Sequence, residues 1–401
     1  MKKRLAVFAV SLASVFALRL MLMETMPVFE PSEARYAAIS ANMCRTGDFL
    51  TPMFTYKGVY QPFEGKPPLV FQCAGAVCSI IGVNEFAVRL VPFVSFLILL
   101  ALLGHAVGRL YGKASGFLAA GICATCVAAY GAAGMCMTDI PLTCCSAGAL
   151  FMYACYRKCR SIGYSLAIGV LLGCGMLVKG PIAIALFALP IFADAAVNRG
   201  WRGILDMKLM WAVLPFIIIA APWFVFMERA HPGFLKYFFI NENLLRFLVH
   251  DYGDRYGAGR ETFRGMAAVW MLVVTLPWCV VPLWELAHRR FGAFAKRDFF
   301  LCGALAITAF WCLTSRVPMA YLLPVVPLFS AWLGSWRCSR VLLWRSLPYA
   351  ACIAGIVSAG ALCAGLLFTD KMLGEASPKR ISKKCFAYEF YHGPWGEGAP
   401  Q

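Results

Sequence analysis

Charged side chains gather in one segment of an otherwise apolar sequence. Residues 24–68 lie between two hydrophobic stretches and hold acids close to bases: Glu30, Glu33, Asp48 and Glu64 beside Arg35, Lys57 and Lys66. A carboxylate can take a proton from a hydroxyl group or stabilise positive charge at a reacting carbon, and lysine and arginine bind phosphate. This mixture predicts chemistry on a charged, phosphate-bearing substrate.

The composition places this chemistry at a membrane. Of the 401 residues, 61% are hydrophobic and 14% are charged, and the mean hydropathy is +0.71. Soluble domains carry about 25% charged residues. Apolar runs of about 18 residues or more recur along the chain, as they do in transmembrane helices. We expect an all-α polytopic membrane protein with about eleven transmembrane helices, in a range of about 9–13.

Basic clusters orient these helices. Many lysines and arginines lie in short loops between apolar stretches, and the positive-inside rule assigns such loops to the cytoplasm. The net charge of +17 therefore reflects membrane topology rather than a nucleic-acid partner. The expected organisation is a transmembrane unit over residues 1–368, with two extracytoplasmic loops at 24–68 and 228–264, followed by a short polar tail over 369–401.

Local spacing predicts the elements that hold the first loop. Residues 5–22 predict an uncleaved first helix. Residues 32–44 have helical spacing and predict a helix that lies along the membrane surface, with Ser32 as its cap. The apolar piece over residues 68–81 is too short to span and predicts a half-embedded helix. The remaining apolar runs predict single helices, among them those over about 114–134, 266–287 and 347–368.

Five polar features fall on the extracytoplasmic side of this topology. They are the first loop, Asp139, Lys179, the second loop with Asn241, Glu242, Asn243 and Arg246, and Arg316 with Tyr321. Each feature alone is typical of an ordinary turn. Their convergence on one face indicates a site for a charged lipid head group.

Cysteines and histidines do not predict a metal site. Most of the 18 cysteines lie inside apolar runs, where they act as small packing residues, and the five histidines are scattered. We therefore expect no metal and no firmly implied cofactor. A divalent ion held by carboxylates is the alternative.

Several short motifs occur in a characteristic order. They are Glu30-Pro31-Ser32-Glu33-Ala34-Arg35-Tyr36-Ala37, Gly65-Lys66-Pro67-Pro68-Leu69, Thr138-Asp139-Ile140-Pro141, Lys179-Gly180-Pro181, Asn243-Leu244-Leu245-Arg246-Phe247 and Tyr321-Leu322-Leu323-Pro324. Over most of residues 1–335 this set resembles the membrane glycosyltransferases of the GT-C superfamily, namely the aminoarabinose transferases of lipid A and the protein O-mannosyltransferases.

The resemblance implies an enzyme with a polyprenyl-phosphate-linked sugar as donor. Such enzymes transfer the sugar, with inversion, to an envelope acceptor, which is a glycolipid of the lipid A type or a protein. The implied location is the bacterial inner membrane, with the active site on the extracytoplasmic face and the lipid bilayer as a partner. By motif, the resemblance implies that the carrier phosphate and the substrate are bound by Arg35, Lys66, Glu64, Lys179, Arg246 and Tyr321. It implies that the catalytic residues are Glu33, Glu30 and Asp139.

One position departs from the family pattern. Ser32 stands where many relatives have an aspartate that serves as the catalytic base, and a serine cannot accept a proton without help. Glu33 or Glu30 can take over that role. Alternatively the acceptor is already ionised, as a phosphate is, and needs little base catalysis.

Two other classes of protein share some of these features. A transporter or flippase would place its polar residues at the bilayer midplane, within two repeated halves. No internal repeat is visible here, and the charges gather at one face. A non-catalytic partner in envelope assembly would bind the carrier without transferring sugar, and Ser32 keeps that alternative open.

Overall fold

A computed structural model describes residues 2–29, 31–56, 58–199, 208–245, 262–287 and 298–336, and a few residues further on, including 389 and 390. The described chain is helical apart from one two-stranded hairpin. The last predicted helix, over about 347–368, lies almost wholly outside the described residues, as does much of the second loop.

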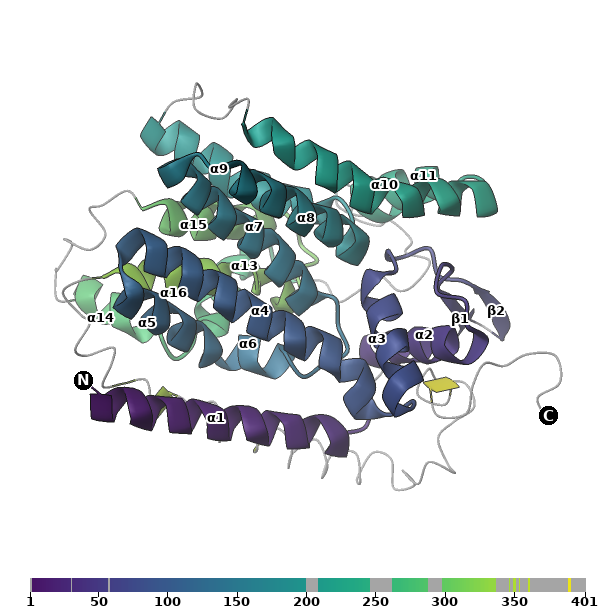
Figure 1. Cartoon of the computed structure of the whole chain (residues 1–401), viewed down its shortest axis with the longest axis horizontal. Helices are drawn as coiled ribbons and strands as arrows, with labels where there is room; N and C mark the ends of the chain where they lie inside the picture. The colour runs from purple at the N-terminus through teal and green to yellow at the C-terminus, as the bar shows by residue number, and fades with distance from the viewer. Residues whose placement is uncertain are drawn as a thin grey trace.

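Apolar helices lie side by side along the longest axis of the molecule (Figure 1). The main ones are α1 (Lys2–Thr25), α4 (Glu85–Tyr111), α5 (Lys113–Ala124), α7 (Asp139–Cys159), α8 (Ile162–Lys179), α9 (Ile182–Asp194), α10 (Val213–Ala230), α15 (Phe299–Cys312) and α16 (Val325–Ser335). Helix α7 packs against α4 and α8, α10 packs against α8, and α16 packs against α5 and α15. In the described part of the chain, α4, α8 and the segment Leu209–Ala230 are long and apolar enough to cross a membrane.

Two predicted single helices are broken, and the breaks face each other. The helix expected over about 114–134 is split into α5 and α6 (Val127–Ala132), and that over about 266–287 into α13 (Met266–Val274) and α14 (Val280–Ala287). At the first break the Thr125 hydroxyl accepts a hydrogen bond from Trp278 Nε1 at 2.9 Å. The backbone N–H of Val127 donates to the carbonyl of Leu276 at 3.2 Å. Each break thus satisfies polar groups of the other, as a membrane interior requires.

The first loop forms a small packed unit at one end of the bundle (Figure 1). It contains α2 (Ser32–Thr46) and the antiparallel strands β1 (Met53–Tyr56) and β2 (Val59–Pro62), and it packs against α3 (Leu69–Ile81). The predicted helices over 32–44 and 68–81 are confirmed. Helix α2 ends at Gly47, whose φ of 73° favours glycine.

Two details of α2 differ from the expectation. Pro31 occupies the N-cap position and no side chain caps the helix, so Ser32 is the first helical residue and the predicted cap is wrong. The helix is buried from Glu33 to Met43, because α3 and β1 pack against it. Protein contacts, rather than an apolar face turned to lipid, therefore hold α2 in place.

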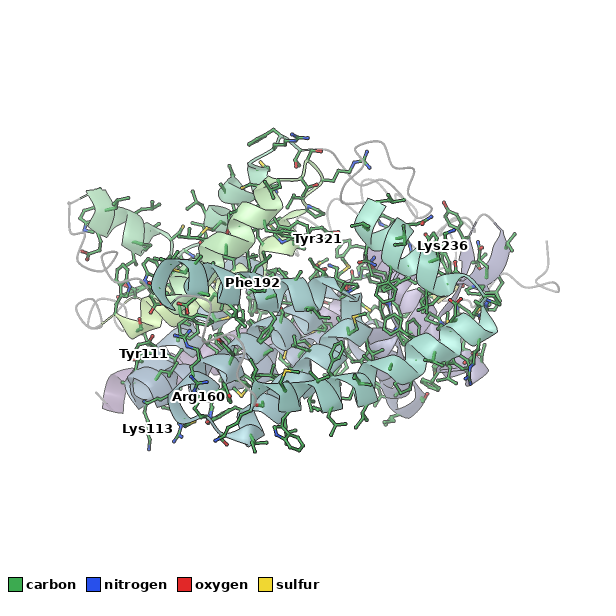
Figure 2. All side chains as sticks on the ribbon, turned by 90° about the horizontal axis from the view of Figure 1, so that it is seen from above. Tyr111, Lys113, Arg160, Phe192, Lys236 and Tyr321 are labelled. Atoms are coloured by element: carbon green, nitrogen blue, oxygen red, sulfur yellow. The ribbon has the colours of Figure 1, made fainter. Side chains whose placement is uncertain are left out.

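Short irregular helices complete the same end of the molecule. Helix α11 (Phe234–Lys236) leads into a π-helix, η4 (Tyr237–Leu245), and the 3₁₀ turn η6 (Met319–Leu322) precedes α16. Figure 2 shows Lys113 and Arg160, which belong to the basic turns that the sequence analysis assigned to the cytoplasm, at the end opposite to Lys236.

The C-terminal part of the chain contacts the first loop. The Glu389 carboxylate accepts hydrogen bonds from Asn42 Nδ2 at 2.7 Å and from the backbone N–H of Thr55 at 3.0 Å. Arg45 donates to the carbonyl of Phe390 at 2.6 Å, and the Phe390 ring is buried. This contact ties residues 389 and 390 to α2 and β1.

Burial raises the pKa of the Glu389 carboxyl above its ordinary value, and hydrogen bonds from Asn42 and Thr55 oppose the shift. A raised acid pKa favours docking while the carboxyl is protonated, and that contribution is lost as the pH rises through the raised pKa. We expect Thr55 N–H exchange, corrected for the intrinsic rate, to be better protected at mildly acidic pH than at pH 8. In Glu389→Gln the pH dependence should disappear, and its persistence there would contradict this origin.

Candidate active site

A cavity of about 300 Å³ opens beside the first loop. Its polar wall is formed by Lys66, Asp139, Lys179, Glu242, Arg316 and Tyr321. Its apolar wall includes Leu142, Ile182, Leu186, Phe310, Trp311 and Pro324. The cavity therefore combines several charged groups with a surface suited to an apolar ligand.

Asp139 and Lys179 form an ion pair at this cavity. Lys179 Nζ lies 2.7 Å from Asp139 Oδ1, and the two side chains are 11% and 7% exposed. Nζ also lies 4.6 Å from the centre of the Tyr321 ring, within cation–π range. Asp139 begins α7 and Lys179 ends α8, where the helix dipoles favour an anion and a cation respectively. Helices α7 and α8 and the turn η6 thus bring together three residues that the sequence predicted.

Lys66 forms a second ion pair, which joins the two outer loops. Its Nζ lies 2.8 Å from Glu242 Oε1 and also donates to the carbonyl of Gly65 at 2.7 Å. Lys66 comes from the segment between β2 and α3, whereas Glu242 comes from η4. The sequence placed Glu242 on the outer face, but not among the site residues. Its position beside Asn241 and Asn243 in an otherwise apolar stretch was the signal.

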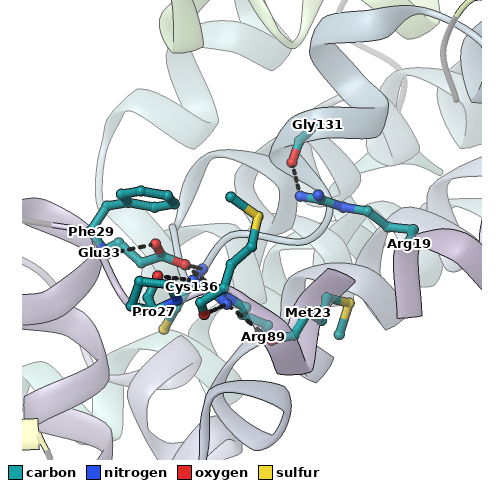
Figure 3. Close-up of polar contacts among 9 residues, drawn as sticks. Arg19, Met23, Pro27, Phe29, Glu33, Arg89, Gly131 and Cys136 are labelled. Atoms are coloured by element: carbon teal, nitrogen blue, oxygen red, sulfur yellow. Dashed lines mark hydrogen bonds and ion pairs between the residues drawn. The ribbon is translucent and has the colours of Figure 1, made fainter. Parts of the chain in front are cut away.

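Glu33 lies in a different polar cluster (Figure 3). Its Oε1 accepts from Arg89 Nε at 2.8 Å and from the backbone N–H of Cys136 at 2.9 Å. Its Oε2 accepts from the backbone N–H of Phe29 at 3.0 Å. The Glu33 and Arg89 side chains are 1% and 2% exposed. The structure therefore does not bring Glu33 to the cavity, because its oxygens are engaged in this cluster.

Arg89 completes the cluster by binding the end of the first helix. Its guanidinium donates to the carbonyls of Met23 at 3.0 Å and Pro27 at 2.9 Å. Nearby, Arg19 of α1 donates to the carbonyl of Gly131, as Figure 3 also shows. The two arginines thus fasten α1, and the start of the first loop, to the bundle.

The remaining predicted site residues are placed as follows. Arg35 is buried, with its guanidinium 6.0 Å from the centre of the Phe63 ring. Neither Arg35 nor the half-buried Glu64 is among the residues that line the described cavity. Glu30 and Arg246 lie outside the described residues. Within the residues that the structure covers, no three His, Cys, Asp or Glu side chains are grouped so as to hold a metal ion.

Residues 65–226 match the family described as dolichyl-phosphate-mannose-protein mannosyltransferase. Curated relatives are named undecaprenyl phosphate-alpha-4-amino-4-deoxy-L-arabinose arabinosyl transferases. That of Enterobacter sp. (strain 638) is 27% identical over 58% of this chain and 42% of its own length. That of Erwinia tasmaniensis is 25% identical over 75% of this chain and 54% of its own length. The chain thus spans about half the length of these curated relatives.

Solved structures show the same fold. ArnT from Cupriavidus metallidurans bound to undecaprenyl phosphate aligns with a TM-score of 0.71 and 20% identity, over 92% of this chain and 66% of that chain. The Archaeoglobus fulgidus oligosaccharyltransferase in the apo form aligns with a TM-score of 0.57 and 14% identity, over 99% and 61%. In sequence this chain is thus similar to the dolichyl-phosphate-mannose-protein mannosyltransferase family and to curated aminoarabinose transferases, and in fold it is similar to ArnT.

Proposed function

We propose that the chain is an integral-membrane glycosyltransferase that moves a sugar from a polyprenyl-phosphate carrier to an envelope acceptor. The observation that carries the proposal is the cavity in which Lys66, Lys179 and Arg316 lie with two carboxylates beside apolar side chains. A sugar linked to a lipid phosphate needs such a combination of cations, hydrogen-bonding groups and apolar surface.

Carrier binding is assigned to the cations of the cavity. Lys66, Lys179 and Arg316 would neutralise the phosphate and so make it a better leaving group. Tyr321 packs beside Lys179 and would limit how that ammonium moves. Arg246 is retained from the family pattern as a further ligand. For Arg35, whose guanidinium lies over Phe63, we propose a role in packing the first loop.

The chemical step is assigned to Asp139. The acceptor oxygen attacks the anomeric carbon while the bond from that carbon to the phosphate oxygen breaks, and the electron pair leaves with the phosphate. The proton of an acceptor hydroxyl passes to the Asp139 carboxylate. In the empty cavity Asp139 Oδ1 accepts a hydrogen bond from Lys179, and a bound phosphate that draws the ammonium away would leave that oxygen open to the acceptor hydroxyl.

The membrane arrangement proposed here follows the sequence expectation. The chain would cross the bacterial inner membrane with about eleven helices, within about 9–13. Its transmembrane unit would cover residues 1–368, with outer loops at 24–68 and 228–264 and a tail over 369–401. The site would face the extracytoplasmic side. Asp139 and Arg160 supply the support, because they lie at opposite ends of α7 and Arg160 belongs to a basic cluster.

A transfer assay tests this proposal. Purified protein in nanodiscs would receive undecaprenyl-phosphate-linked sugars as donors and a bacterial lipid extract as acceptor, and carrier binding would be measured separately. Lys66→Ala removes a charge-assisted contact and should weaken carrier binding by about 10–100-fold. Lys113→Ala, at the other end of the molecule, is the matched control and should bind as the wild type does.

The alternatives predict different results. Carrier binding that depends on Lys66, without transfer of any sugar, would support the non-catalytic assembly partner. Movement of the lipid across the bilayer without a new glycosidic bond would support a flippase.

A further inference from the structure

We propose that Glu242 is a positioning residue that competes with the carrier phosphate for Lys66 and promotes release of the spent carrier. This inference rests on the proposed function and deepens it. Glu242 would hold the Lys66 ammonium at the cavity wall when the cavity is empty, and it would share the ammonium with a phosphate when one arrives.

The ion pair is built so that a phosphate can enter it. The Lys66 and Glu242 side chains are 16% and 4% exposed, so the carboxylate is nearly withdrawn from water and depends on a nearby cation. An ammonium has three N–H donors, and the contacts to Glu242 and Gly65 use two of them. The third leaves room for a phosphate oxygen beside Glu242, and the two anions then share one cation.

The backbone that carries Glu242 is held firmly. Phe238 of η4 is fully buried and lies 5.6 Å from the Phe234 ring in a stacked arrangement. The Phe238 carbonyl accepts a hydrogen bond from Asn243 Nδ2 at 2.7 Å. A Cβ added to Gly180 would lie 2.6 Å from Phe238, so only glycine allows this close contact. Because Gly180 directly follows Lys179, one packing contact links the two ion pairs of the cavity.

The charges of the cavity make its affinity depend on the state of the carrier. Among the described residues that line the cavity, Glu242 and Asp139 lie beside Lys66, Lys179 and Arg316. The sugar-loaded carrier is a phosphodiester with one negative charge. The spent carrier is a phosphate monoester with about 1.5–2 negative charges at pH 7, so a carboxylate of the cavity repels it more strongly. Glu242 therefore weakens binding of the spent carrier more than binding of the sugar-loaded carrier.

The experiment measures undecaprenyl phosphate binding to the full-length protein in nanodiscs. Glu242→Gln keeps the size of the side chain and removes its charge. We expect it to bind undecaprenyl phosphate about tenfold more tightly than the wild type, given the strength of charge interactions at partly buried sites. Binding of a sugar-loaded phosphodiester should tighten less. Glu24→Gln changes an exposed carboxylate at the end of α1 and should leave both affinities unchanged.

Two further variants test whether the effect passes through Lys66. In a Lys66→Gln background the gain from Glu242→Gln should vanish. Glu242→Asp keeps the charge but moves it away from Lys66, so it should tighten binding of undecaprenyl phosphate less than Glu242→Gln does. This variant replaces Glu242→Gln in the test if Glu242→Gln does not yield folded protein.

The outcomes separate this inference from the proposed function. A wild-type protein that does not bind undecaprenyl phosphate overturns the proposed function itself. Wild-type binding that Glu242→Gln leaves unchanged or weakens overturns the inference alone. A variant that binds as the wild type does but transfers no sugar would make Glu242 a catalytic group and overturns the positioning role.

Discussion

Replacing Arg89 by leucine is expected to destabilise the protein by about 3–5 kcal/mol, because the Glu33 carboxylate would remain buried without its cation. Arg89 also holds carbonyl groups at the end of α1, which would lose their donors. Thermal unfolding of the detergent-solubilised protein, followed by tryptophan fluorescence, measures the effect. Arg109→Leu, at an exposed position on the same helix, is the matched control and should change the midpoint little.

A second set of variants decides what Glu33 does. If the Arg89–Glu33 ion pair is structural, Glu33→Gln should lower the stability of the protein. The double variant Arg89→Leu/Glu33→Leu should then be more stable than Arg89→Leu alone, because no charge is buried without a partner. If Glu33 is the catalytic base, Glu33→Gln unfolds as the wild type does but transfers no sugar. The hydrogen bonds from Arg89, Cys136 and Phe29 favour the first result.

Local sequence spacing predicted the parts of the first loop that depend on local structure. The helix over 32–44 is signalled by apolar residues at helical spacing and by the Gly47 that ends it. The short helix over 68–81 follows from its length. The Asp139–Lys179 pair could be predicted for a related reason, because the expected topology put the two residues at ends of apolar helices on one face.

Local sequence spacing could not predict contacts between distant segments of the chain. The partner of Glu33 is Arg89, 56 positions away, and no periodicity reveals that the two side chains meet. The breaks near Thr125 and Leu276 were missed because apolar composition continues through both. A polar group that has a partner inside the bundle leaves no mark in a hydropathy profile.

The same limit applies to Glu242. Its stretch of chain predicted an outer loop, and η4 is instead a π-helix, a form that is frequent at functional sites. Its contact with Lys66 spans 176 positions. The sequence therefore predicted that polar residues such as Asp139, Lys179 and Tyr321 gather in one place, whereas the contact of Glu242 with Lys66 came from the structure.

Replacing Asp139 by asparagine is expected to lower sugar transfer to a hydroxyl acceptor by about 10²–10⁴-fold, which is the usual contribution of a general base. The amide keeps the size of the side chain and can still accept a hydrogen bond from Lys179. Binding of undecaprenyl phosphate should be kept, because no cation of the cavity is removed. Single-turnover transfer and carrier binding, measured side by side, separate the two effects.

Asp48→Asn provides the matched control, since Asp48 is an exposed aspartate of the first loop whose Oδ1 accepts from the backbone N–H of Leu50. It should transfer as the wild type does. The acceptor then decides how the Asp139→Asn result is interpreted. An acceptor that attacks through an ionised phosphate carries no proton to remove, so its transfer should fall less than about tenfold in the same variant. Equal losses with hydroxyl and phosphate acceptors would contradict a base role and would point to Asp139 as the counterion that orients Lys179.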